Sequence, residues 1–266
     1  MLSASLILLL CAGACAGILA GLLGIGGGIV LVPVLLWWLS SQAVDANVVN
    51  HIAIATALAT MLGTAPASAF AHYRHGAVDL ARIRRWALPV MLGAGIGAVL
   101  ARWIPGDWLR SLFAVLALTV GFGMSLGRKP VWQLANHRDG PALASGIGLL
   151  SSWLGIGGGS FFVPALTQFG IPLRTAIGTS SGLGLAIALP ATVGYIAAGW
   201  PVEGRPHGTL GFVHVVAALV LASSAAALAP IGAKIAHHAP VTWLRRLFGV
   251  FLLIVGIRLL VGIFRG

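Results

Sequence analysis

The chain has 266 residues, of which 59% are hydrophobic and only 8% are charged. Soluble domains carry about 25% charged residues, and no soluble fold can bury this much apolar surface. The composition therefore excludes a soluble protein and indicates an all-α integral membrane protein in a lipid bilayer. The formal net charge of +11 comes from basic residues in short loops, which is typical of the positive-inside rule and argues against a nucleic-acid partner.

The first unusual stretch is GLLGIGGGIVLVPVL at 21–35, and its pentapeptide Gly-Ile-Gly-Gly-Gly recurs at 155–159. In both copies a proline follows the first glycine at the same spacing. Glycine costs about 1 kcal/mol in a helix interior, so each cluster predicts a broken helix. The arms of the second copy, 142–154 and 160–170, each reach only part of a roughly 30 Å hydrocarbon core, which predicts a re-entrant hairpin. For the first copy, where 2–22 is long enough to span, a hairpin and a full crossing both stay open.

Six further apolar segments approach the length of about 20 residues that a transmembrane helix needs; they cover 47–71, 86–104, 108–127, 174–198, 210–232 and 243–264. The segment that begins at His51 aligns with the one that begins at Arg174, with Thr56 opposite Thr179. We expect an internal duplication, with a first repeat over 1–127 and a second over 128–266. Each repeat is a glycine-tipped hairpin and three transmembrane helices.

The loops predict the orientation. Basic residues mark 73–85, 128–138 and 234–246 as cytoplasmic, whereas the loops with Asp107 and Glu203 face outside. Three helices and a hairpin without net crossing give each repeat an odd number of crossings. The second repeat is therefore expected to be inverted relative to the first, with both termini periplasmic.

The two glycine-rich stretches resemble the sequence signatures of a known family. The stretch at 21–35 and the pair GIGGGSFFVPAL and TAIGTSS at 155–181 are similar to the paired signatures of the sulfite exporter TauE/SafE family of membrane permeases. The first half departs from that pattern, reading IATAL at 54–58. The resemblance implies carriage of sulfite, sulfonates or related small organic anions across a bacterial inner membrane.

Inverted repeats with interrupted helices are typical of secondary carriers, and the breaks indicate the substrate site. Glycines that open a helix leave backbone N–H groups at its positive end free for an anion. Neighbouring hydroxyls add neutral donors. The candidate binding residues are Gly26, Gly27, Gly28, Gly157, Gly158, Gly159, Ser160, Thr56, Thr179, Ser180 and Ser181. The alternative is that the glycines allow close helix packing and the hydroxyls bond neighbouring helices.

The driving force follows from charge. Every acidic residue lies in or beside a loop, so membrane potential alone is expected to drive anion export. Import would need a partner ion, with His51 and His214 as proton handles, and Arg174 is a candidate vestibule residue. A passive channel and a proton-coupled importer stay open as alternatives, as does a homo-oligomer. We expect no enzyme activity, cofactor or metal. Cys11 and Cys15 share a helix face, and we expect them to be buried.

Overall fold

The structure is a computed structural model that describes residues 2–42, 44–101, 111, 114–115, 118–119, 121–122 and 140–265. Helices dominate this part of the chain. Their bounds are α1 Leu2–Leu23, α2 Gly28–Ser40, α3 Ala46–Arg74, α4 Leu80–Leu100, α6 Gly140–Leu154, α7 Gly159–Gln168, α8 Leu173–Gly199, α9 Val215–His238 and α10 Val241–Arg265. Five of them (α1, α3, α4, α8 and α9) are long and apolar enough to cross a membrane. The prediction of an all-α membrane protein is confirmed.

Two predicted spans begin elsewhere. The carboxylate of Asp79 accepts the N–H of Arg82 at 2.9 Å and caps α4, so this helix begins before the predicted residue 86. The connection from α3 is consequently a short turn. A two-stranded hairpin, β1 Thr209–Leu210 with β2 Val213–His214, occupies the predicted start of the 210–232 span. Most of the predicted span 108–127 and the basic loop 128–138 lie outside the described residues.

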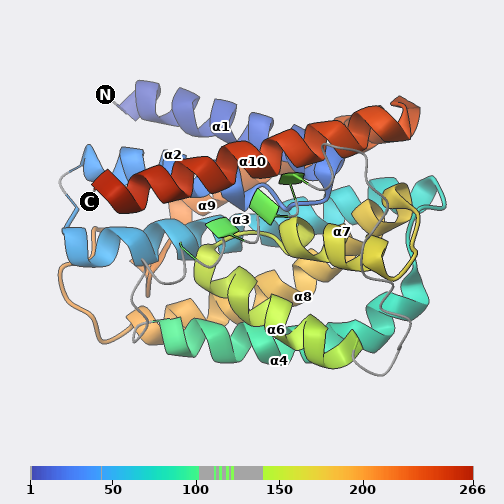
Figure 1. The fold of residues 1–266 in the computed structure, drawn as a ribbon. Coiled ribbons are helices and arrows are strands. Elements are labelled where there is room, and N and C mark those ends of the chain that lie inside the picture. The colour runs from blue at the N-terminus through green and yellow to red at the C-terminus, as the bar shows by residue number, and fades with distance from the viewer. Residues whose placement is uncertain are drawn as a thin grey trace.

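The long helices run alongside one another, and the marked N and C ends lie on the same side of the bundle (Figure 1). Ser68, near the end of α3, bonds Ser181, near the start of α8. Phe212 contacts both Gly199, at the end of α8, and His51, near the start of α3, so α3 and α8 are antiparallel. We call the end where α3 and α9 finish and α4 and α8 begin the basic end. Its arginine and lysine residues include Arg74, Arg82, Arg84, Arg85, Arg174, Lys234 and Arg246.

Glycines allow two helix pairs to pack closely. Gly17 of α1 lies against the backbone of Ala225 in α9, and Gly148 of α6 lies against the backbone of Val90 in α4. Further along, Gly21 meets Ala229, so α1 runs parallel to α9 and approaches the basic end. Small residues are typical of such close approaches between membrane helices.

Each glycine cluster joins the arms of a hairpin. α2 returns from its cluster to the end opposite the basic end, where Trp38 contacts the ring of His214 at 5.2 Å. α7 returns to the basic end, where Phe169 lies 5.7 Å from the Arg82 guanidinium. Both copies are therefore helix hairpins within the bundle, and α1, the first arm of the first copy, is long enough to cross a membrane.

The outer surface is apolar, as expected for side chains that face lipid. Leu88 and Leu92 of α4 and Leu219 of α9 are among the exposed large hydrophobic residues. Cys11 and Cys15 share a face of α1, as predicted, but that face is exposed. The expectation that they are buried is wrong, because the buried side of α1 is formed by its small residues against α9.

Candidate functional site

The two glycine clusters, which we call the first tip (24–28) and the second tip (155–159), lie against each other. A Cβ atom added to Gly28 would collide with the carbonyl oxygen of Gly155, and one added to Gly159 would collide with that of Gly24. The first residue of each tip thus meets the last residue of the other. The tips cross antiparallel, at a separation that only glycine permits.

The centre of this crossing is Gly26 opposite Gly157. A Cβ on Gly26 would lie 3.1 Å from the Cα of Gly157 and 2.7 Å from the terminal methyl of Met61, a fully buried residue of α3. Gly26 also has a φ of 70°, a left-handed conformation that side chains other than glycine adopt at a cost. Conformation and space both require glycine at this position.

Each tip also lies on a long helix of the other half. A Cβ on Gly24 would be 2.6 Å from the carbonyl oxygen of Ile177 in α8, and one on Gly155 would be 3.1 Å from the Cα of Ile54 in α3. Ile54 and Ile177 occupy matching places in the internal alignment. The two tips therefore have corresponding surroundings, with α3 and α8 exchanged.

The helices that leave the tips begin in the same way. The carbonyl of Gly27 accepts the N–H groups of Val30 and Leu31, at 3.0 and 3.1 Å, and the carbonyl of Gly158 accepts the corresponding pair in α7. Neither α2 nor α7 has a side-chain cap. The positive ends of both helices are thus directed into the region where the tips cross, which favours negative charge there.

Two of the candidate hydroxyls bind the starts of other helices. The hydroxyl of Thr56 accepts the backbone N–H of His214 at 3.0 Å, and that of Thr179 accepts the backbone N–H of Asp79 at 2.9 Å. These bonds link α3 to the start of α9 and α8 to the start of α4. Both threonines are fully buried, and in this conformation they connect helices.

The candidate serines divide into two kinds. Ser180 donates to the carbonyl of Gly24 at 3.1 Å, and Ser181 donates to Ile177 within α8 at 3.1 Å. Ser160, in the first turn of α7, is only 4% exposed, and its hydroxyl has no hydrogen-bond partner in the structure. An unpaired buried hydroxyl is costly, and this lack of a partner distinguishes Ser160 from the other candidate hydroxyls.

The three vestibule candidates do not come together. His51 stacks on Phe212 at 5.1 Å, and His214 caps α9 by accepting the N–H of Ala217 at 3.3 Å. Both lie at the end opposite the basic end. Burial lowers the pKa of His214 below its ordinary value. Arg174 lies at the basic end, where it donates to the carbonyl of Ala239 at 2.8 Å.

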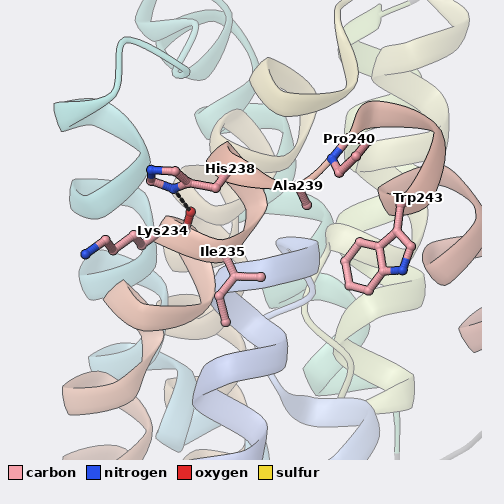
Figure 2. A pocket seen from close by; sticks show the side chains of 6 residues that line it. All are labelled: Lys234, Ile235, His238, Ala239, Pro240 and Trp243. Carbon is pink, nitrogen blue, oxygen red and sulfur yellow. Dashed lines mark hydrogen bonds between the residues drawn. The ribbon is translucent and has the colours of Figure 1, made fainter.

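Two pockets open at the basic end. One of about 580 Å³ lies between α9 and α10; Figure 2 shows Lys234 and His238 on one side and Trp243 on the other, with Ile235, Ala239 and Pro240 between them. The second, of about 310 Å³, is lined by Asp79, Ala81, Arg82, Arg85, Trp86, Gly140 and Phe169. The residues of the tips line neither of these pockets.

Sequence reasoning missed a histidine cluster at the same end. His72 Nδ1 lies 3.0 Å from His237 Nε2, and the ring of His75 is stacked on that of His237. His72 aligns with Tyr195 in the other half, so the internal alignment did not indicate a shared histidine. A count of histidines close to the helix ends would have indicated these residues, but not their contact.

The helices and the crossed, interrupted hairpins define a multi-pass membrane protein of the kind that carries solutes. The chain belongs to the sulfite exporter TauE/SafE family, whose sequence model matches residues 9–259. It is thus a membrane transporter and not an enzyme.

The relatives carry matching names. A probable membrane transporter protein of Haemophilus influenzae is 32% identical, covering 96% of this chain and 97% of its own length. One of Xylella fastidiosa is 35% identical over 66% of this chain and 68% of its own length. The probable membrane transporter protein YunE of Bacillus subtilis is 25% identical over 73% and 80%. No solved structure matches the chain.

Proposed function

We propose that the protein exports small sulfur-containing anions, such as sulfite or organosulfonates, across a bacterial inner membrane. The observation that carries this proposal is the crossing of the two tips, from which two uncapped helix N-termini begin. The description of the family supports a sulfur oxyanion as the substrate.

The chemistry of the site suits a small oxyanion. Backbone N–H groups at two helix N-termini supply partial positive charge without a competing lysine or arginine. The hydroxyl of Ser160 is buried and unpartnered beside one of these termini. A trigonal or tetrahedral anion accepts several such donors at once.

We propose further that the halves 1–127 and 128–266 are inverted repeats. Corresponding contacts support this: Thr56 binds the start of α9 as Thr179 binds the start of α4. The matching helices α3 and α8 are antiparallel, as inversion requires. The proposed orientation places the basic end in the cytoplasm and both termini in the periplasm.

The mechanism that we propose is alternating access. In the described conformation the tips touch, so an anion can enter between them only when one hairpin moves. α1 and α2 form one such hairpin, and α6 and α7 form the other. Contact between the tips favours a carrier over a passive channel, because a channel needs a continuous path.

Anion flux in proteoliposomes tests the proposal. The panel contains sulfite, an aliphatic and an aromatic sulfonate, sulfate and a carboxylate of similar size. We expect saturable flux of sulfite or a sulfonate, which Ser160→Ala weakens in protein that still inserts and elutes as a single species. Flux that rises linearly with concentration would indicate a channel, and selectivity for the carboxylate would contradict the proposed substrate class.

A further inference from the structure

The histidine cluster contains a buried pair with a defined hydrogen-bond direction. His72 is fully buried, and its Nε2 lies 2.7 Å from the carbonyl oxygen of Gly21 in α1. A carbonyl oxygen only accepts, so Nε2 carries a hydrogen atom. In the neutral ring Nδ1 is then an acceptor, and His237 must donate its Nε2–H across the 3.0 Å contact.

The cluster leads from water to the interior. His75 is exposed, His237 is half-buried and His72 is fully buried, and the His75 and His237 rings stack at 4.3 Å. The series ends at the carbonyl of Gly21, which cannot pass a proton on. The arrangement thus suits a site that binds a proton from one side and does not conduct it.

Tyr195, the residue that aligns with His72 in the other half, makes the corresponding contact with a phenol in place of an imidazole. Tyr195 of α8 donates its hydroxyl to the carbonyl of Ser152, in the last turn of α6, at 3.2 Å. A side chain of each long helix thus holds a carbonyl just before a tip. A phenol keeps its proton at physiological pH, whereas imidazole titrates there, so the first tip alone is held by a titratable group.

We propose that the His72–His237 pair is a proton-binding latch, which holds the last turn of α1 when neutral and releases it when a proton binds from the basic end. This goes beyond the proposed anion export and does not depend on the identity of the anion.

The direction follows from the neighbouring charges. The groups that act on the pair are His75 of α3, Arg174 of α8 and His238 of α9, all of them basic, while α1 presents the Gly21 carbonyl. Among the described residues, no carboxylate acts on the pair. A proton added at Nδ1 of His72 removes the acceptor for the His237 Nε2–H and creates a buried cation without a counter-charge. The Nε2–H bond to the Gly21 carbonyl favours the cation, but the cost of burying the charge is the larger effect. Acid favours a conformation in which water reaches His72, and Gly24, three residues after Gly21, is freed with it.

A cysteine reporter tests the latch without any transported anion. Ser68→Cys, in protein with Cys11→Ala and Cys15→Ala, places a thiol one turn before His72 at a buried site. Its rate of labelling by a membrane-impermeant maleimide is measured between about pH 8 and pH 5.5, where imidazole titrates. Each rate is divided by that of the same reporter with His72→Gln, whose amide can donate to Gly21 but cannot bind a proton. This ratio cancels the titration of the thiol itself.

We expect the ratio to rise as pH falls, by up to about tenfold per pH unit, the limit for one linked proton. His237→Gln should flatten it, whereas Tyr195→Phe, the matched control in the other half, should leave its pH dependence intact. A flat ratio, or pH dependence that survives His237→Gln, overturns the latch. If His72→Gln does not fold, each labelling rate is divided instead by that of the reporter with His237→Gln. His237→Asn then becomes the variant that should flatten the ratio. If the labelling ratio rises on acidification but proteoliposomes show no anion flux, the proposed function is overturned and the latch is not.

Discussion

Gly159 lies directly against the carbonyl oxygen of Gly24, and the reciprocal contact joins Gly28 to Gly155. The glycines that face the other tip recur every second residue in both copies. The clustering in the sequence thus has a packing reason as well as the proposed role in anion binding.

Gly159→Ala should destabilise the fold, because its methyl group collides with the backbone of the first tip. We expect a loss of about 1–3 kcal/mol, the usual range for overpacking, and a large loss of flux. Thermal unfolding in detergent measures the first effect. The control is Gly146→Ala in α6, where an added Cβ has nothing within 4 Å; equal destabilisation by both variants would contradict the packing account.

Ser160→Ala should weaken anion binding without lowering stability, because the hydroxyl makes no hydrogen bond that the variant would lose. Ser180→Ala is the comparison, since it removes a bond to the first tip and should cost about 1 kcal/mol. KM for the transported anion and the unfolding temperature are measured for both. An unchanged KM in Ser160→Ala would remove this residue from the proposed site.

Single cysteines should report the proposed orientation in protein that lacks Cys11 and Cys15. Ala81→Cys at the basic end should react with an impermeant reagent only from the cytoplasm, and Glu203→Cys only from the periplasm. Both side chains are exposed. Lys129→Cys, outside the described residues, should behave like Ala81→Cys. Labelling of Lys129→Cys from the periplasm would contradict the inverted repeat.

His214 should make stability depend on pH. Burial lowers its pKa below the ordinary value of 6.5, so below about pH 6.5 the unfolded chain binds more protons, and stability is lost as pH falls from there through the lower pKa of the folded state. Protonation also removes the lone pair that accepts the Ala217 N–H. His214→Asn keeps a capping acceptor without titrating here. The unfolding temperature of the wild type should therefore fall more on acidification than that of the variant; parallel curves would contradict this role.

Anion efflux should follow membrane potential and need no sodium, because none of the helices in the described ranges contains Asp or Glu. Moving one charge releases roughly 2.3 kcal/mol per 100 mV. Proteoliposomes with valinomycin and a potassium gradient, at equal pH on both sides, measure this effect. An inside-negative potential should accelerate release of a divalent anion more than of a monovalent one. Flux that ignored voltage and followed a pH gradient would indicate proton coupling.

The sequence by itself determined the membrane class, the two glycine breaks and most of the helices, because composition and apolar length are properties of each segment alone. It also paired Thr56 with Thr179, and both make corresponding contacts. It placed the start of α4 too late, because the prediction followed the long apolar segment and overlooked the capping carboxylate that precedes it.

Only the tertiary structure decided which distant groups meet. The antiparallel crossing of Gly26 and Gly157 depends on how two hairpins pack between α3 and α8, and no local pattern encodes that register. The contact between His72 and His237 joins residues 165 positions apart. Ser160 and Ser180 have the same chemistry in the sequence, yet one hydroxyl is buried without a partner and the other holds a tip. That difference arises because a hydrogen bond requires a partner in space, and packing alone supplies or withholds it.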